Sequence, residues 1–449
     1  MNRIVLALYS VLMWLGQPLL RRKLASRSRQ EPGYSEAPDE RFGRYTQPAE
    51  TTPELVWVHA VSLGETRTAA ILVKAMREQF PGLRVLLTHG TATGRAEGAS
   101  LLRAGDVQVW QPWDSAAAVT RFLAHFKPRL GLLMETEVWP NMVAAAVARA
   151  TPLLLINARL SEKSLQQALA MAPLSCPAYG ALTAVYAQTE DDAKRLRQLG
   201  APVRGIFGNL KFDAAPDPAQ QAMGKTWRRA VTRPVIMFAS SREGEEELFF
   251  KEISAAVQSA RAQAATVSIA DTATSDSPER RKTLPHFLVV PRHPQRFDDV
   301  QALAQKYGLG VSRRSHWRAG PCDHEEACQA DVWLGDTLGD MALYYALSDV
   351  ALLGGSFAPL GGQNLIEAAA CGCPVVMGPH TFNFSEAAAL AEASGAAQRV
   401  ADMQGAVVQA LQLANDAPAR EHAAAAGLAF AARNRGACAG TLAALTRYL

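Results

Sequence analysis

Three glutamates in the first half of the chain are the residues best suited to acid–base chemistry, and each follows a short apolar run. Glu65 comes after residues 55–59, and Glu135 and Glu137 come directly after residues 130–134. A carboxylate in such a place can take a proton from an incoming hydroxyl. It can equally complement the dipole of a following helix or cap it, so the residue types leave both roles open.

Residues 354–369 form the most specific stretch, Gly-Gly-Ser-Phe-Ala-Pro-Leu-Gly-Gly-Gln-Asn-Leu-Ile-Glu-Ala-Ala, between an apolar run and a predicted helix. Glycines let a backbone approach a ligand, and the N–H groups at a helix start attract anions. We expect a phosphate there, with Glu367 one turn further in as an acceptor for ribose hydroxyls. The stretch therefore favours a nucleotide site over a plain tight turn capped by Asn364.

Several strand-end loops add candidate contacts for an anion. Arg292 follows the run 287–290 and offers a fixed positive charge. Gly339, in residues 335–340, has a backbone that is free to contact a ligand. Lys211 and Arg159 lie in loops of the first half of the chain, and Ser161 is close to Arg159 in sequence. No Asp-x-Asp motif accompanies the phosphate site. Charge on a leaving group would then be met by the helix start and Arg292 rather than by magnesium.

The elements that position these residues follow from an alternation that begins at residue 55. Short continuous apolar runs, typical of buried parallel strands, alternate with longer helical patterns. The alternation breaks at Pro216 and Pro218 and then restarts. The predicted strands are residues 55–59, 84–88, 107–110, 130–134, 152–156 and 184–187, then 235–238, 287–290, 332–334, 350–353 and 374–377. This predicts an α/β protein with two doubly wound domains in series, whose ligands lie at the carboxyl ends of the strands.

The N-terminus differs from the rest of the chain in being a long uncharged apolar run followed by basic residues. Residues 4–20 carry no charge, and Arg21, Arg22, Lys23, Arg27 and Arg29 follow them. This predicts a membrane-anchor helix, apolar all round and inserted, with the bulk of the chain on the cytoplasmic side. A cleaved signal peptide is the alternative, but its charge should precede the apolar run.

Composition narrows the class of protein. The chain has 449 residues, of which 49% are hydrophobic and 20% charged, as in globular proteins. A net charge of +4 is too balanced for a nucleic-acid binder. Six scattered cysteines predict neither a disulfide framework nor a structural metal site. Residues 255–282 are rich in Ala, Ser, Thr and Asp and predict the end of a helix running into a disordered surface insertion.

Four runs resemble the 3-deoxy-D-manno-octulosonic acid (Kdo) transferases of lipopolysaccharide assembly, and the likeness extends from the N-terminus to about residue 397. They are residues 59–65 (His-Ala-Val-Ser-Leu-Gly-Glu), 134–141 (Met-Glu-Thr-Glu-Val-Trp-Pro-Asn), 208–213 (Gly-Asn-Leu-Lys-Phe-Asp) and 377–384 (Met-Gly-Pro-His-Thr-Phe-Asn-Phe). The resemblance implies a GT-B fold, two Rossmann-like domains facing a cleft, and an inverting transfer without metal or cofactor. It implies CMP-Kdo as donor, the lipid A precursor (lipid IVA) as acceptor, and a place on the cytoplasmic side of the inner membrane.

The resemblance also implies roles for single residues. Glu65 matches the catalytic proton acceptor, and Glu135 and Lys211 match positions that stabilise the transition state. Two positions depart from the bacterial pattern: Asp340 stands in place of Glu, and Gln363 in place of His. The implied CMP contacts are Pro291, Arg292, Leu338, Gly339, Asp340, Asn364, Leu365, Ile366 and Glu367.

These interpretations divide the chain into four parts. Residues 1–23 form the anchor, 24–52 a linker, 53–215 an acceptor-binding domain, and 216–449 a CMP-sugar-binding domain with the insertion at 255–282. Two alternatives stay open: another GT-B enzyme that uses a UDP-sugar, as a transferase or epimerase, and a membrane-tethered binding protein without catalysis. Preference for CMP or UDP would separate the enzymes, and turnover of CMP-Kdo would separate enzyme from binder.

Overall fold

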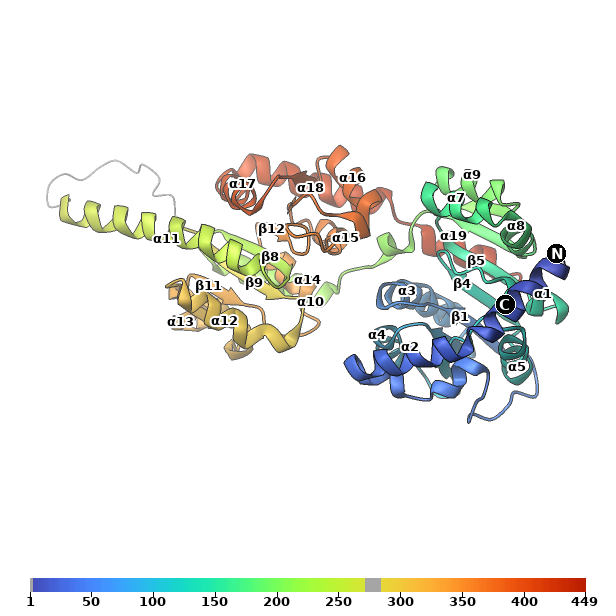
Figure 1. Ribbon diagram of the computed structural model, residues 1–449. Coiled ribbons are helices and arrows are strands. Elements are labelled where there is room, and N and C mark those ends of the chain that lie inside the picture. Colours follow the sequence, from blue (N-terminus) through green and yellow to red (C-terminus); the bar gives the residue numbers. More distant parts are fainter. Residues whose placement is uncertain (1–2, 271–283) are drawn as a thin grey trace. The chain divides into compact units, whose positions relative to one another are not determined.

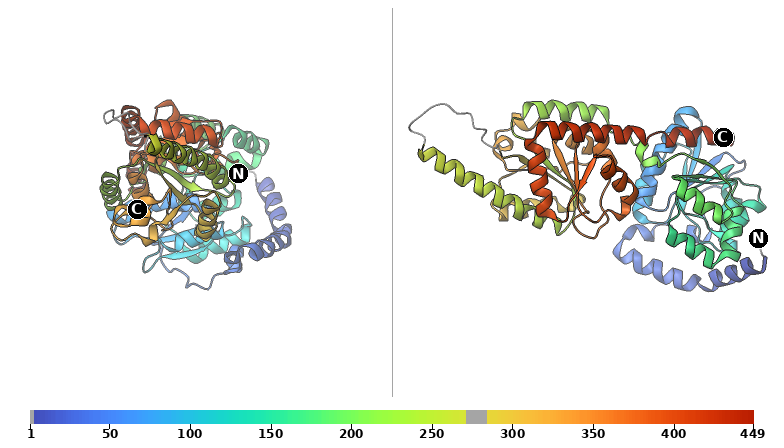
Figure 2. Two further views of the ribbon diagram at one scale, coloured as in Figure 1. Left: turned by 90° about the vertical axis from the view of Figure 1, so that its left-hand side faces the viewer. Right: turned by 90° about the horizontal axis from the view of Figure 1, so that it is seen from above.

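The computed structural model describes residues 3–270 and 284–449. The chain forms two compact units, Met1–Asp213 with Asn434–Leu449, and Ala214–Arg433. Each contains one seven-stranded sheet in which every pairing is parallel, with helices on both faces (Figures 1 and 2). Two doubly wound α/β units in series are confirmed.

The first sheet has the order β3-β2-β1-β4-β5-β6-β7, so the strand order reverses between β1 and β4. Its strands are β1 (Leu55–His59), β2 (Arg84–His89), β3 (Val107–Trp110), β4 (Leu130–Met134), β5 (Leu153–Ala158), β6 (Ala184–Ala187) and β7 (Val203–Ile206). Its helices are α1 (Arg3–Leu15), α2 (Gln17–Gln30), α3 (Leu63–Gln79), α4 (Ala92–Ala99), α5 (Ala116–Phe126), α6 (Pro140–Ala148), α7 (Glu162–Ala170), α8 (Ala172–Gly180), α9 (Glu190–Gln198) and α19 (Ala437–Leu445), with short 3-10 helices η1 (Pro32–Ser35), η2 (Pro38–Phe42) and η3 (Leu210–Asp213).

The second sheet has the order β10-β11-β9-β8-β12-β13-β14. Its strands are β8 (Val235–Ser241), β9 (His286–Pro291), β10 (Val311–Arg313), β11 (Val332–Leu334), β12 (Val350–Leu353), β13 (Val375–Met377) and β14 (Ala397–Arg399). Its helices are α10 (Pro218–Ala230), α11 (Glu245–Ala270), α12 (Phe297–Lys306), α13 (Glu325–Gln329), α14 (Met341–Leu347), α15 (Leu365–Ala370), α16 (Ser385–Ala393), α17 (Met403–Asn415) and α18 (Ala417–Arg433), with η4 (Pro294–Arg296), η5 (Arg314–His316), η6 (Pro321–Asp323) and η7 (Phe382–Phe384).

Both faces of each sheet are buried, which explains the continuous apolar runs of the strands. In the first unit, one face packs against Phe122 of α5 and Met142 of α6, and the other against Leu72 of α3 and Leu445 of α19. In the second unit, Phe249 of α11 is among the residues that cover one face. The sheets thus hold their carboxyl-end loops on rigid cores.

The apolar N-terminus is not one helix. It forms α1 and α2, which are bent by 47° at a break around Gly16, because Pro18 in the first turn of α2 has no N–H to continue the helical ladder. Within the described residues, no individual helix has the length and apolarity to cross a bilayer, although the bent pair together meets that standard.

The predicted linker at residues 24–52 is wrong, because this segment packs on the first unit. Its first residues belong to α2, and η2 covers the edge strand β3. The buried Glu40 carboxylate accepts hydrogen bonds from the Trp110 backbone N–H (2.8 Å) and from Arg95 (2.9 Å), and the Arg41 guanidinium lies 4.0 Å from the Trp110 ring centroid. Covering an edge strand in this way prevents pairing with other chains.

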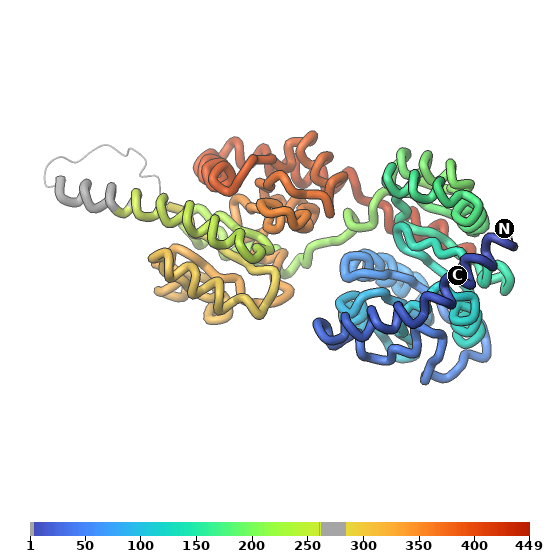
Figure 3. The backbone as a smooth tube through the Cα atoms, in the orientation of Figure 1, coloured from blue at the N-terminus to red at the C-terminus, as the bar shows by residue number. Residues whose placement is uncertain are grey.

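The predicted domain boundary needs a correction at the C-terminus. The sequence places residues 434–449 in the second domain, but they belong to the first unit, where α19 lies against α3 (Figure 3). Asp213 caps this helix, since its carboxylate accepts hydrogen bonds from the backbone N–H groups of Gly436 and Cys438, both at 2.7 Å. The second unit also begins at Ala214 rather than at residue 216.

The predicted insertion at 255–282 begins as helix. Helix α11 continues to Ala270, so the first part of this stretch is the end of a helix, as the sequence predicts. The remaining positions of the predicted insertion, 271–282, lie outside the described residues.

Candidate active site

Glu65 is held at the carboxyl end of β1 by a capping box at the start of α3. The Ser62 hydroxyl accepts a hydrogen bond from the Glu65 N–H (3.4 Å) and donates one to Glu65 Oε1 (2.9 Å). The Val61 N–H donates to Oε2 (2.9 Å). Ser62 is therefore the N-cap of α3, and Glu65 lies in the first turn, where it can also complement the helix dipole. The bonds from Val61 and Ser62 fix its carboxylate at the sheet edge.

The surroundings of Glu65 make it a better base. Burial raises the pKa of its half-buried carboxyl group, and the negative charges of Glu135 and Glu137 raise it further, although the bonds from Val61 and Ser62 oppose the shift. A carboxylate with a raised pKa binds a proton more readily, which suits a general base.

Glu135 is the centre of an ion cluster directly after β4. Its backbone is in the left-handed region (φ 55°), and its side chain is buried. The carboxylate lies 2.6 Å from Arg159 Nε, beyond β5, and 3.5 Å from Lys211 Nζ in η3. Strained backbone of this kind gathers at functional sites, and here it brings together three elements.

Glu137 forms a separate contact with a buried histidine. Its Oε2 lies 3.7 Å from Nε2 of His59 and accepts a hydrogen bond from the Trp139 ring N–H (2.8 Å). Burial raises the pKa of Glu137, but His59 and Trp139 outweigh burial and the net shift is downward. Helix α6 has no side-chain cap, so Glu137 does not serve that alternative role.

Asn157, at the end of β5, has a positioning role that its residue type does not reveal. Its backbone is left-handed (φ 49°), and its buried Oδ1 accepts a hydrogen bond from the Leu210 N–H (3.0 Å). This bond fixes the residue before Lys211. Only a contact between loops distant in sequence reveals this role.

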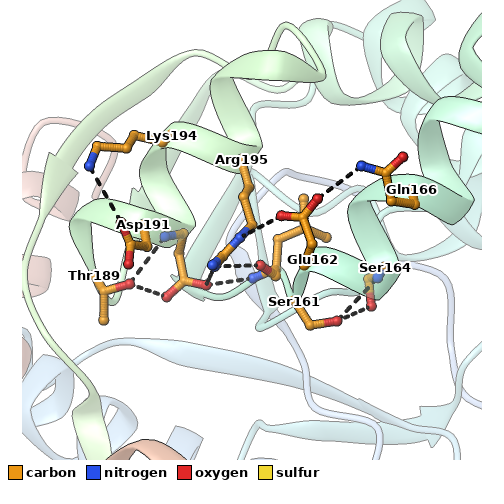
Figure 4. Close-up of polar contacts among 10 residues, drawn as sticks. Ser161, Glu162, Ser164, Gln166, Thr189, Asp191, Lys194 and Arg195 are labelled. Carbon is orange, nitrogen blue, oxygen red and sulfur yellow. Dashed lines mark hydrogen bonds and ion pairs between the residues drawn. The ribbon is translucent and has the colours of Figure 1, made fainter.

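Ser161 has a structural role instead. Its hydroxyl caps α7 by accepting a hydrogen bond from the Ser164 N–H (3.1 Å), and Figure 4 shows it beside a separate ion pair of Arg195 and Glu162. The expected anion contact through Ser161 is therefore unsupported, whereas Arg159 lies on Glu135.

In the second unit, two of the expected nucleotide contacts converge. Pro291 ends β9 opposite Ser241 of β8, and the Arg292 N–H donates to the Ser241 carbonyl (3.0 Å). The charges of Arg292 and Glu367 both shift the pKa of the buried Tyr345 hydroxyl. Burial raises its pKa most, Glu367 raises it further, and Arg292 lowers it.

The glycine-rich loop has the conformation that its glycines predict. Gly361 and Gly362 have φ values of 90° and 75°, and a Cβ on Gly361 would lie 2.3 Å from Asn383 Nδ2. Asn364 caps α15 through the Ile366 N–H (3.1 Å). Helix α15 spans only Leu365–Ala370, so its dipole is weaker than a full helix would supply. The Leu365 and Ile366 side chains are buried, which leaves only their backbone for a ligand.

The loop before α14 offers a mixed set of contacts. Leu338 is 75% exposed, and Gly339 has a left-handed backbone whose carbonyl accepts a hydrogen bond from Gln220 (2.9 Å). The Asp340 carboxylate accepts one from Thr337 (2.6 Å) and lies 3.8 Å from Arg314. Asp340, which is shorter than the glutamate of the bacterial pattern, thus contacts Thr337 within its own loop.

Two Rossmann-like units in series are the architecture of the GT-B fold, and similar solved structures show the same fold. A UDP-GlcNAc 2-epimerase from Neisseria meningitidis matches with a TM-score of 0.51 and 16% identity over 88% of this chain and 99% of that one. A glycosyltransferase from Rickettsia africae ESF-5 matches with a TM-score of 0.52 and 12% identity over 89% and 99%.

Sequence comparison identifies the family. The family model of 3-deoxy-D-manno-octulosonic-acid transferases matches residues 36–214. A 3-deoxy-D-manno-octulosonic acid transferase from Bordetella pertussis is 48% identical over 88% of this chain and 87% of its own, and one from Haemophilus influenzae is 30% identical over 98% of both. The chain belongs to the family of Kdo transferases. It is a glycosyltransferase that transfers Kdo in lipopolysaccharide biosynthesis.

Proposed function

We propose that this chain transfers Kdo from CMP-Kdo to the lipid A precursor with inversion at the anomeric carbon, and that Glu65 is the base. The observation that carries the proposal is the half-buried Glu65 carboxylate, fixed at the carboxyl end of β1 and raised in pKa by burial and by Glu135 and Glu137. It is built to take a proton at the sheet edge where α/β enzymes act.

In the proposed step, Glu65 takes the proton from the primary hydroxyl of the acceptor glucosamine. The oxygen forms a bond to the anomeric carbon of Kdo as the bond from that carbon to the CMP phosphate oxygen breaks, and CMP leaves with the electron pair. Lys211 and Arg159 hold Glu135 in its left-handed conformation and place positive charge near the reacting groups. This charge opposes the negative charge that builds up in the transition state.

The second unit takes the donor in this proposal. Arg292 meets anionic oxygen, and Glu367 accepts hydrogen bonds from ribose hydroxyls. The backbone at Gly339 and Asn364 supplies further contacts. The leaving phosphate is neutralised by cationic side chains in this scheme, so we expect turnover to be unchanged by a chelator of divalent metals.

We propose that α1 associates with the inner membrane, on its cytoplasmic side. Tyr9 donates a hydrogen bond to Asp114 (2.9 Å) and Ser10 donates one to Asn141 (2.8 Å), which docks one side of α1 on the first unit. The other side exposes an apolar stripe, and exposed basic residues follow in α2. This division favours a helix lying in the membrane surface over the inserted helix that the sequence predicts. The stripe consists of Ile4, Leu8, Val11, Leu12 and Leu15, and Leu19 is exposed beyond the bend, in α2.

The direct test incubates the full chain with CMP-Kdo and lipid IVA in lipid vesicles and measures the lipid by mass spectrometry. We expect the mass of one or more Kdo residues to be added. A lipid of unchanged mass with a chain that still binds CMP would contradict lipid IVA as acceptor.

Calorimetric titration with CMP and UDP tests the donor. CMP should bind more tightly than UDP. Preference for UDP would support the alternative of a UDP-sugar enzyme and contradict CMP-Kdo as donor. Binding of CMP without turnover of CMP-Kdo in the presence of any lipid acceptor would favour the tethered binding protein.

A further inference from the structure

The connection between β8 and α11 lies at the carboxyl edge of the second sheet and has an unusual backbone. Ser240 is left-handed (φ 54°), and the pairing of β8 with β9 shifts between Ala239 and Ser241. Gly354 lies so close that a Cβ there would be 2.3 Å from the Ser240 carbonyl oxygen. A strained residue at a sheet edge is kept in place only by strong contacts around it.

Glu245 provides those contacts. Its fully buried carboxylate accepts hydrogen bonds from the N–H groups of Gly355 (2.7 Å), Phe357 (3.0 Å) and Ala358 (3.2 Å), and from that of Arg242 (3.2 Å). One side chain thus ties the β8–α11 connection to the glycine-rich loop after β12.

These bonds change which groups can bind the donor. The N–H groups of Gly355, Phe357 and Ala358 are the ones that a glycine-rich loop would offer to a phosphate, and Glu245 already uses them. An anionic donor must therefore find its partners elsewhere at this edge, on side chains rather than on this part of the loop.

Arg242 is placed to be such a partner. It directly follows Ser241, which pairs with Pro291, so Arg242 and Arg292 leave neighbouring strands at the same level. The Arg242 side chain is half-buried, and within residues 3–270 and 284–449 its guanidinium has no acidic partner. Arg296 nearby differs, because it lies 3.2 Å from the buried Glu246.

The lowered pKa of His293 reflects the positive charge at this edge. Burial lowers its pKa most, and Arg242, Arg292 and Arg296 each lower it further. An anion that joined the neighbouring side chains of Arg242 and Arg292 would reduce the repulsion between their positive charges. The surroundings of Arg242 thus suit an anionic group of the ligand.

We propose that Arg242 is a second donor-binding arginine, which contacts an anionic oxygen of the donor beside Arg292, and that Glu245 is a positioning residue that holds it there. The inference rests on the proposed function, since it takes CMP-Kdo as the donor. That donor carries two anions, the phosphate of CMP and the carboxylate of the sugar, and a guanidinium can hold either through paired N–H groups.

The test compares Arg242→Gln with Arg229→Gln in the full chain. Arg229 is an exposed arginine in the last turn of α10, ahead of β8 and thus near the opposite edge of the sheet, and its loss removes the same charge. The affinity for CMP is measured by calorimetry, and KM and kcat are measured with CMP-Kdo. We expect R242Q to lose roughly 10- to 100-fold in one of the binding readouts, as is typical when one partner of a charged hydrogen bond is removed, and R229Q to match the wild type.

The readouts distinguish the two anions. Weaker CMP binding by R242Q assigns Arg242 to the phosphate. Unchanged CMP binding with a raised KM for CMP-Kdo assigns it to the sugar carboxylate. Unchanged CMP affinity and KM, whatever the value of kcat, would overturn the inference. Failure of the wild-type chain to bind CMP would instead refute the proposed donor.

Glu245→Gln tests the positioning role. The glutamine keeps the shape but brings an amide N–H₂ against backbone N–H groups. If Glu245 acts through Arg242, the variant E245Q should lose affinity in the same readout as R242Q, and the double variant should lose less than the product of the two effects. Independent effects that multiply would overturn the positioning role while leaving Arg242 to be judged by its own variant.

Discussion

The two units share one architecture but use its carboxyl edge in opposite ways. In the first unit, the edge carries acids, Glu65, Glu135 and Glu137, and the cations there lie on Glu135. In the second unit, the edge carries arginines, and its buried acids Glu245 and Glu246 are occupied with backbone N–H groups, Ser241 and Arg296.

In the proposed mechanism, this difference divides one reaction between the two units. An acid with a raised pKa, as Glu65 has, can take a proton from a hydroxyl, whereas arginines and a rigid glycine-rich loop can hold an anionic donor. The comparison therefore predicts that variants in the first unit impair turnover and variants in the second impair donor binding.

The largest expected effect belongs to Glu65→Gln. The amide keeps an oxygen that can accept a hydrogen bond from Val61 or Ser62 but cannot accept the proton, so kcat should fall by about 10²–10⁴-fold with folding intact. Steady-state kinetics measure this effect. Glu78→Gln, exposed in the last turn of the same helix, is the matched control and should match the wild type. Retained turnover in E65Q would contradict the role of Glu65.

Next in size is Arg292→Gln. Loss of a charge-assisted contact, worth about 1.5–3 kcal/mol, should weaken CMP binding by roughly 10- to 100-fold. Calorimetric titration with CMP measures the affinity. If R292Q binds CMP as tightly as the wild type, Arg292 is not the donor contact that the comparison requires.

The sequence predicts most of the scaffold because central parallel strands are continuous apolar runs, as in β1, β4 and β12. It misses β7, β10 and β14, which have only three or four residues and are partly exposed. It also misses the covering of β3 by Glu40 and the capping of α19 by Asp213. These contacts join segments far apart in sequence and leave no local pattern.

The site was predictable to a similar degree and for similar reasons. Glu65, Glu135 and Arg292 stand out because they follow apolar strands, whereas Lys211 stands out because residues 208–213 carry the family resemblance. Glu245 does not, because an acid in the first turn of a helix is ordinary, and only the folded loop reveals its bonds to Gly355 and Phe357.

Gly361→Ala should disturb the second unit alone. The new Cβ would lie 2.3 Å from Asn383 Nδ2 at a φ of 90°, so we expect a loss of at least about 1 kcal/mol of stability and weaker CMP binding. Thermal unfolding measures the stability. Gly244→Ala is the control, because it has a similar φ of 86° but no neighbour within 4 Å. Equal effects of both variants would show that backbone strain alone, and not the contact with Asn383, fixes the loop.

Glu137→Gln should move a pH profile rather than abolish activity. Glu65 is active when deprotonated, so kcat/KM rises as pH rises through its pKa. Removing the charge of Glu137 lowers that pKa and shifts the acidic limb to lower pH. A profile measured from pH 4 to pH 8 tests the direction. A shift to higher pH would contradict the coupling of the two acids.

The two units should differ least in their stability at acidic pH, because each contains a buried histidine with a lowered pKa. Burial lowers the pKa of His89 in the first unit to about 4 and that of His286 in the second to about 3. The unfolded chain, with histidine near 6.5, then binds more protons below that pH, so the free energy of unfolding should fall as pH drops from about 6.5. Denaturant titrations at pH 7 and pH 5 measure it, and equal stability at both would contradict the assignment.

The division between the two edges is tested most directly by titrating Glu65→Gln and Arg292→Gln with CMP side by side. The account predicts that E65Q binds CMP as the wild type does, although it barely turns over CMP-Kdo, and that only R292Q binds CMP weakly. Weak CMP binding by E65Q, or unchanged binding by R292Q, would contradict the separation of proton transfer from donor binding.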